Sequence, residues 1–162
     1  MGSGYTKTCP KCGFEYHSST GVGFMFPRVY IETVQKAKEG ELGKELQDFF
    51  KDHKDGAINA EYVDLCCKEC GHLSSGMDLT MYIPNEKKPE KIKHGRWTVG
   101  MSFEDVDYVD WSDLDEFYTE YAKYPHKCEK CGGDMEILKE NEELKCPECK
   151  IPLEITNIIM WD

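Results

Sequence analysis

Eight of the nine cysteines in this chain occur in pairs separated by two residues. We call each C-x-x-C pair a hook: the first is Cys9/Cys12, the second Cys67/Cys70, the third Cys128/Cys131 and the fourth Cys146/Cys149. Two cysteines at this spacing can turn both sulfurs toward one metal ion, and a structural zinc site takes four such ligands in a tetrahedron. The four hooks therefore predict two tetrahedral metal sites.

Spacing along the chain predicts that neighbouring hooks share a site. The third and fourth hooks are separated by 14 residues, which is near the spacing typical of zinc-binding pairs. We therefore predict a C-terminal site from Cys128, Cys131, Cys146 and Cys149. An N-terminal site follows from Cys9, Cys12, Cys67 and Cys70, because a glycine comes directly after each of its two hooks. The expected cofactors are two Zn²⁺ ions, with iron as the alternative.

The ninth cysteine and two nearby histidines are left outside these sites. Cys66 precedes the second hook and can be a buried small hydrophobe, an alternate ligand or a reactive thiol, of which the first is commonest for free cysteine. His72 and His126 lie near hooks, but each predicted site already has four sulfurs. We therefore expect neither histidine to bind the metal.

Metal binding is favoured over disulfide bonding by the compartment that the sequence indicates. The first five residues, Met1 to Tyr5, form neither a basic start nor an apolar run, and no stretch approaches 18 consecutive apolar residues. These features predict a cytoplasmic protein without a secretory signal or membrane span. Because structural disulfides are rare in a reducing cytosol, we expect thiolates. Four paired hooks are also unlike the single motif of a thioredoxin-type redox site.

Between the first and second hooks, the hydrophobic pattern predicts helices. Apolar residues recur at helical spacing over residues 31–39 and 43–54, and Gly40 and Gly56 are candidate stops. Strands are predicted over residues 61–66 and 77–83, the second from its alternating pattern. We therefore define an N-terminal domain, residues 1–86, as a zinc ribbon with a helical insert.

The second half begins with a basic linker, residues 87–96, that contains Lys87, Lys88, Lys91, Lys93 and Arg96. Residues 97–162 then form a second domain, an acidic segment followed by a ribbon. Strands are predicted over residues 97–103, 135–139 and 153–161. A short acidic helix is predicted over residues 113–123, because Ser112 followed by Asp115 is similar to a capping box. The predicted fold class is α+β, with two ribbons of short antiparallel hairpins.

The sequences around three hooks resemble those of zinc-ribbon and rubredoxin-like proteins. They are Cys-Pro-Lys-Cys-Gly at residue 9, Cys-Glu-Lys-Cys-Gly-Gly at residue 128 and Cys-Pro-Glu-Cys at residue 146. The chain as a whole looks like uncharacterised small bacterial zinc-ribbon proteins. The resemblance implies metal-bearing β-hairpins, a scaffold used for protein contact, nucleic-acid contact and electron transfer. Lys150 stands where rubredoxin-like hooks usually have glycine.

Charge decides between these uses. The formal net charge is −11, and two tetrathiolate zinc centres, each formally −2, would bring it to about −15. Because binding a phosphate backbone needs a basic face, direct nucleic-acid binding is disfavoured. The basic linker is the one basic cluster, and we interpret it as a solvated segment.

The acidic segment from Phe103 to Tyr121 is the better functional candidate. Its carboxylates alternate with aromatic residues, a composition suited to a basic partner surface. A cation site from Asp105, Asp107 and Asp110 is a weaker interpretation, since the glycine and terminal glutamate of an EF-hand loop are missing. The alternative without a binding function is a helix with a solvated acidic face.

The sequence contains no convincing set of nucleophile, base and orienting group, so we expect that the protein is not an enzyme. The predicted function is a zinc-stabilised, non-catalytic protein-binding or adaptor module with an acidic surface. The alternatives are a rubredoxin-like electron carrier and an inhibitor or regulator of a nucleic-acid-handling protein. The partner and the oligomeric state do not follow from the sequence.

Overall fold

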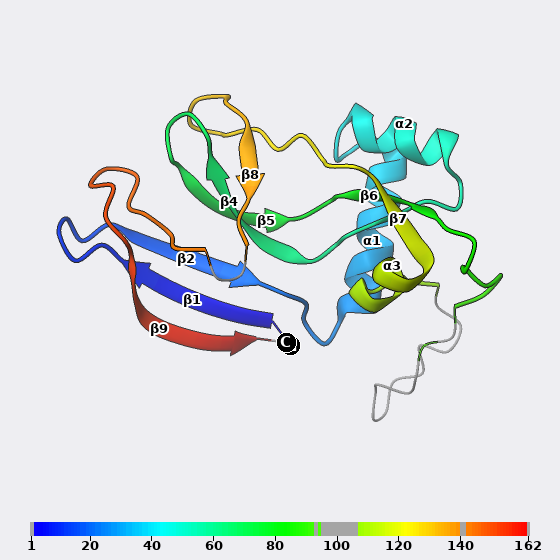
Figure 1. Ribbon diagram of the computed structural model, residues 1–162, viewed down its shortest axis with the longest axis horizontal. Coiled ribbons are helices and arrows are strands. Elements are labelled where there is room, and N and C mark those ends of the chain that lie inside the picture. Colours follow the sequence, from blue (N-terminus) through cyan, green and yellow to red (C-terminus); the bar gives the residue numbers. More distant parts are fainter. Residues whose placement is uncertain (1, 93, 95–106, 140–141, 162) are drawn as a thin grey trace. The chain divides into compact units, whose positions relative to one another are not determined.

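The computed structural model is an α+β protein, described for residues 2–92, 94, 107–139 and 142–161 (Figure 1). The chain folds into two compact units. Unit 1 contains Met1–Phe24, Glu61–Asp78 and Pro125–Asp162, and unit 2 contains Met25–Ala60 and Leu79–Tyr124. All four hooks belong to unit 1.

These units are built differently from the consecutive domains 1–86 and 97–162 that the sequence suggests. Each unit is discontinuous, because the chain leaves unit 1 after Phe24, returns at Glu61, leaves again after Asp78 and returns at Pro125. Both excursions belong to unit 2. The helical insert and the acidic helix therefore share one unit, while the two ends of the chain share the other.

Unit 1 contains two antiparallel sheets of three strands each. The first has the order β2-β1-β9, from β1 (Gly2–Thr8), β2 (Glu15–Thr20) and β9 (Glu154–Trp161). The second has the order β5-β4-β8, from β4 (Tyr62–Cys67), β5 (Leu73–Met77) and β8 (Met135–Ile137). In each sheet a hairpin pairs with a strand that comes much later in the sequence.

The interior of unit 1 includes a small apolar cluster and a buried carboxylate. Tyr16, Leu73 and Leu144 are buried together. Phe14, Cys66, Leu138 and Leu153 pack against them while partly exposed. Asp64 is also buried and accepts hydrogen bonds from the hydroxyl of Tyr16 at 2.8 Å and that of Ser18 at 2.7 Å.

Unit 2 combines three helices with a third antiparallel sheet. The helices are α1 (Phe26–Glu39), α2 (Lys44–Asp52) and α3 (Trp111–Phe117). The sheet has the order β3-β6-β7, from β3 (Ala57–Ile58), β6 (Met81–Pro84) and β7 (Tyr118–Ala122). Its buried apolar side chains include those of Tyr30, Leu46, Phe49, Phe50, Ile58 and Met81.

The helical insert was predicted correctly in kind but not in its limits. Helix α1 starts earlier than residue 31, since Pro27 in its first turn fixes a helical φ. It ends as expected at Gly40, which adopts φ +87°. Helix α2 ends before Gly56, at His53, whose amide donates back to Phe49.

Two other predicted elements are wrong in their extent. The helix expected over residues 113–123 stops at Phe117, because the following residues pair with β6 as strand β7. Its capping box is formed by Asp110 and Asp113, not by Ser112 and Asp115. The strand expected over residues 77–83 is split into the end of β5 and β6 at Leu79, which adopts φ +59°.

Three of the predicted strands near the hooks lie close to observed ones. The expected strands 61–66, 135–139 and 153–161 correspond to β4, β8 and β9. The strand expected over residues 97–103 lies outside the described residues. Among the helices that the structure describes, none combines the length and the apolar character needed to cross a membrane.

Candidate metal centres

The eight hook cysteines form two groups of four, as predicted, but the hooks pair differently. The outer site, as we call it, joins the first and fourth hooks through Cys9, Cys12, Cys146 and Cys149. The inner site joins the second and third hooks through Cys67, Cys70, Cys128 and Cys131. The predicted pairing of neighbouring hooks is therefore wrong, and the inner site lies within the loop that the outer site closes.

Strand pairing in unit 1 explains this nested arrangement. The first hook is the turn between β1 and β2, and strand β9, which follows the fourth hook, pairs with β1. The second hook is the turn between β4 and β5, and strand β8, which follows the third hook, pairs with β4. Each sheet thus brings one hairpin hook next to one later hook, and the same two hooks share a site.

All four hooks have the same backbone conformation. The amide of the first cysteine donates to the carbonyl five residues later, and the amide four residues later donates back to that cysteine's carbonyl, at 2.8–3.0 Å. These bonds hold each hook as a tight turn. The first-cysteine bonds are Cys9 to Phe14, Cys67 to His72, Cys128 to Gly133 and Cys146 to Ile151.

The residue after each hook adopts a left-handed conformation. Three of the hooks have glycine there, Gly13, Gly71 and Gly132, at φ +71° to +75°. The fourth has Lys150 at φ +60°, a conformation that is unfavourable for a residue with a Cβ atom. A methyl group built on Gly71 would lie 3.3 Å from the Lys150 Nζ. The side chain of Lys150 therefore runs from the outer site to the second hook of the inner site.

The sulfur positions fit a tetrahedral ion. Within each group every sulfur lies within 4.8 Å of the others. The sulfur–sulfur distances include 3.6 Å between Cys12 and Cys146, 3.4 Å between Cys67 and Cys131, and 3.8 Å between Cys70 and Cys128. Four sulfurs at about 2.3 Å from a zinc ion are about 3.8 Å apart, whereas a disulfide needs about 2.05 Å. All nine cysteines are free thiols.

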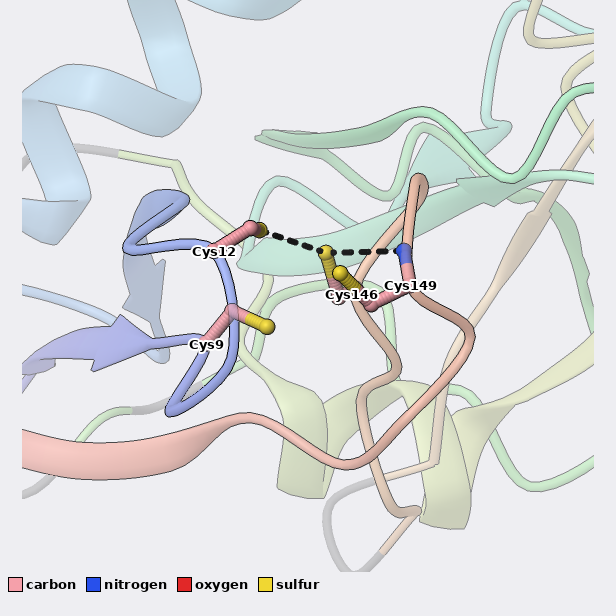
Figure 2. A group of neighbouring side chains, drawn as sticks. All are labelled: Cys9, Cys12, Cys146 and Cys149. Atoms are coloured by element: carbon pink, nitrogen blue, oxygen red, sulfur yellow. Dashed lines mark hydrogen bonds between the residues drawn. The ribbon is translucent and has the colours of Figure 1, made fainter.

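The two cysteines of a hook differ in their exposure. The first cysteine is buried in every hook, whereas the second is half-buried or exposed, with Cys12 and Cys131 the most open. Figure 2 shows the outer site, with the loop of the first hook facing that of the fourth and their sulfurs directed toward one another. Each site therefore has two ligands fixed in the interior and two near the surface.

Backbone amides are directed at several of the sulfurs. The amide of Cys149 lies 3.4 Å from the Cys146 sulfur (Figure 2), that of Cys70 lies 3.5 Å from the Cys67 sulfur, and that of Gly133 lies 3.4 Å from the Cys131 sulfur. Such donors stabilise thiolate rather than thiol. The turns therefore favour the charge state that a metal ligand requires.

Without a cation, the thiols of these groups differ widely in pKa. The amides of Cys70 and Glu69 lower the pKa of Cys67 to about 6, although burial opposes them. In the outer site, the nearby Cys12 sulfur, followed by burial, raises the pKa of Cys149 to about 12. The first proton is lost easily and the last with difficulty, since the sulfurs repel one another as thiolates. A divalent cation would remove that repulsion, so the donor set fits a metal ion.

Cys66, His72 and His126 lie outside both four-sulfur groups. Cys66 packs against the apolar cluster of unit 1, and burial raises the pKa of its thiol. Cys66 is half-buried, and not fully buried as its interpretation as a buried small hydrophobe requires. The ring of His126 is hydrogen-bonded to the carbonyl of Asp78 at 2.8 Å, and the carbonyl of His72 accepts from the Cys67 amide.

A third cluster of possible ligands, not foreseen from the sequence, consists of His94, Asp110 and Asp113 in unit 2. His94 Nε2 lies 2.6 Å from Asp113 Oδ2, and its ring stacks on Tyr108 at 3.8 Å. Both carboxylates already cap α3. Of the three aspartates considered for a cation from the sequence, only Asp110 belongs to this group, and Asp105 lies outside the described residues. His94 and Asp113 are not related by any metal-binding spacing in the sequence, so their proximity could not be predicted from it.

Several carboxylates and aromatic rings of the acidic segment are exposed. Asp115, Glu116 and Glu120 are exposed on α3 and β7, as are Trp111 and Tyr121. In contrast, Tyr118 is buried. We call these five exposed side chains the acidic face of unit 2. The ring of Tyr121 also packs against the rings of Phe49 at 5.5 Å and His53 at 4.8 Å.

No protein-family model, curated protein or solved structure matches this chain.

Proposed function

We propose that this protein is a zinc-stabilised, non-catalytic module that binds other proteins through an acidic surface. The observation that carries the proposal is the completeness of both sulfur groups, because each supplies four thiolates for one tetrahedral ion. A zinc ion held by four protein ligands has no open position for water or substrate. The metal would therefore support the fold and not take part in a reaction.

Zinc is favoured as the ion by the donor set. Four thiolates in a tetrahedron suit zinc or iron, while calcium and magnesium prefer oxygen ligands. The small apolar cluster of unit 1 supports a structural role for the metal, since within the described residues its buried members are Tyr16, Leu73 and Leu144. Together the hooks and their sheets form two ribbon-like metal sites.

The acidic face of unit 2 supports a role in protein binding. Carboxylates beside exposed rings can steer and hold a basic partner, and the net charge of −11 adds to this attraction. An inhibitor or regulator of a nucleic-acid-handling protein is one form of such a module, because the surfaces that hold nucleic acid are basic.

A rubredoxin-like electron carrier is the second candidate. It is favoured by the exposure of Cys12 and Cys131, which would bring a redox-active ion close to the surface. Iron in four thiolates absorbs visible light and bleaches on reduction, whereas zinc has no redox chemistry and is colourless.

Metal analysis and native mass spectrometry of the purified chain test the first half of the proposal. We expect two zinc ions per chain, no visible absorption and no loss of metal on reduction. A red protein with stoichiometric iron would replace the proposed function with the electron carrier. A single ion per chain, or none in a folded protein, would contradict both the zinc-stabilised module and the electron carrier.

Binding through the acidic face is tested by reversing its charge. The test variant has Asp115, Glu116 and Glu120 all changed to lysine. In cell extract it should no longer be cross-linked to the proteins that the unchanged chain captures. The matched control changes three other exposed glutamates of unit 2, Glu39, Glu41 and Glu45, to lysine. Equal capture by the unchanged chain and both variants would contradict the proposed surface.

A further inference from the structure

Strand β9 lies at the edge of the sheet β2-β1-β9 (Figure 1). One side of it pairs with β1 from Gly2 to Thr8. Within the part of the chain that the structure describes, no strand pairs with its other side. An edge of this kind presents a row of backbone amides and carbonyls to another strand.

The side chains of β9 are unusual for an exposed edge. Ile155, Ile158, Ile159 and Met160 are each 55–60% exposed. Ile158 is opposite Tyr5 and Ile159 is opposite Gly4. Because consecutive residues of a strand point to opposite faces, apolar side chains are exposed on both faces of the edge.

The devices that usually protect an edge are scarce here. Proteins block such edges with charged residues, proline or bulges, and residues 155–161 contain neither charge nor proline. The strand has one irregularity, where its register against β1 shifts between Thr6 and Lys7. There the Thr156 hydroxyl donates to the carbonyl of Thr6 at 3.2 Å. Residues 157–161 beyond it remain in regular register and available for pairing.

We propose that two copies of this chain dimerise by antiparallel pairing of residues 157–161 of β9, which joins two three-stranded sheets into one of six. This inference rests on the open edge and not on the acidic face, so it goes beyond the proposed function. A two-fold axis is the usual symmetry of such contacts, in which the same patch meets itself. Every antiparallel register within residues 157–161 pairs only uncharged residues.

Charge favours a second copy over a basic partner at this edge. A chain of net charge −11 repels its own copies wherever carboxylates meet, and this strand is a place where two copies can touch without opposing like charges. A basic segment would find no carboxylate in residues 157–161 to pair with. Isoleucine and methionine side chains, in contrast, are complementary to themselves across an antiparallel seam.

Sedimentation equilibrium of the zinc-loaded full chain, over a range of protein concentrations, tests the dimer. We expect a monomer–dimer equilibrium, with amide exchange in residues 157–161 slowing as concentration rises. Ile158→Lys should raise the dissociation constant by about tenfold or more, because two ammonium groups would lie near one another across the seam. Ile159→Lys should do the same from the other face.

The matched control is Phe24→Lys, which places the same charge at another exposed apolar residue of unit 1 that lies outside β9. It should leave the dimer intact. Two metal ions per chain in each variant would show that the lysines have not unfolded unit 1. A chain that is monomeric at all concentrations, or a dimer that Ile158→Lys and Ile159→Lys leave unchanged, would overturn the proposal. A colourless monomer with two zinc ions would leave the proposed function standing.

Discussion

The sulfurs of Cys12 and Cys146 lie 3.6 Å apart although 134 residues separate them along the chain. They belong to the first and last hooks, whose site closes a loop around the second and third hooks. Both ends of the described chain are thereby held in one unit. Any loss of the outer site should release β9 from β1, because the fourth hook leads directly into β9.

Metal counts in double variants test this nested pairing. Cys9→Ser with Cys146→Ser removes two ligands of the outer site, so one ion per chain should remain. Cys9→Ser with Cys67→Ser damages both sites, and both ions should be lost or weakly held. Native mass spectrometry gives the count directly, and Cys66→Ser is the control that should keep two ions. The reverse result, with both ions lost only in the first double variant, would restore the pairing of neighbouring hooks.

The ligands could be predicted from the sequence, but their pairing could not. A C-x-x-C motif is local, and its turn is set by hydrogen bonds within a few residues. The choice of partner hook depends on which strands pair, as β1 with β9 and β4 with β8. Closing a separation of 134 residues instead of 15 costs only about 2 kcal/mol more in chain entropy. Strand pairing can outweigh that difference, so proximity in sequence is a poor guide.

The same competition explains the error in the acidic helix. Residues 111–122 include the helix formers Leu114, Glu116, Glu120 and Ala122, and a capping pattern marks their start. However, Tyr118 is buried, and the residues after Phe117 pair with β6 in the sheet of unit 2. A helix continuing through Lys123 would give up that pairing. Tertiary contacts override local propensity here, and nothing in the sequence specifies β6 as the neighbour.

Lys150 is the residue whose replacement should increase stability. It adopts φ +60° where the other three hooks have glycine. Lys150→Gly should therefore stabilise the metal-loaded protein by about 1 kcal/mol, the usual cost of a left-handed conformation with a Cβ atom. Thermal unfolding followed by circular dichroism measures the change.

Lys150→Ala is the control for this prediction, since it removes the ammonium group near Gly71 but keeps the Cβ atom. It should give no such gain. In the converse change, Gly132→Ala, the added methyl group has no other atom within 4 Å. Any loss of stability in this variant should therefore come from the left-handed backbone conformation alone. A destabilised Lys150→Gly would mean that the contact with the second hook outweighs the backbone conformation.

Removal of the metal should unfold unit 1 before unit 2. Structural zinc contributes about 10–16 kcal/mol in small peptides, which is comparable with the whole stability of a domain, about 5–15 kcal/mol. Each sheet of unit 1 holds the two hooks of one site, whereas the core of unit 2 around Leu46 and Ile58 contains no cysteine. After chelation, the backbone amides of β1 and β4 should therefore be the first to lose their protection from hydrogen exchange. Unchanged protection in those strands would show that the metal is not structural.

The buried carboxylate of Asp64 should stabilise unit 1 through its two hydroxyl donors. Tyr16→Phe removes a hydrogen bond of 2.8 Å to this carboxylate, and bonds to charged groups contribute about 1.5–3 kcal/mol. We expect a loss of about 2 kcal/mol, measured by urea unfolding of the metal-loaded chain. Asp64→Ala should cost more, because the hydroxyls of both Tyr16 and Ser18 lose their acceptor. Tyr5→Phe, on the neighbouring strand, is the control.

The pH dependence of the Tyr16→Phe variant tests whether Tyr16 stays neutral in the folded chain. Burial and then the negative charge of Asp64 raise the pKa of Tyr16 far above its ordinary value. An unfolded tyrosine ionises at about pH 10, so the stabilisation from a neutral, buried Tyr16 is complete below that pH and decreases as the pH rises above it. The difference between the unchanged chain and Tyr16→Phe should therefore narrow above about pH 10. A difference that stays constant across that range would show that Tyr16 ionises equally easily in the folded and the unfolded chain.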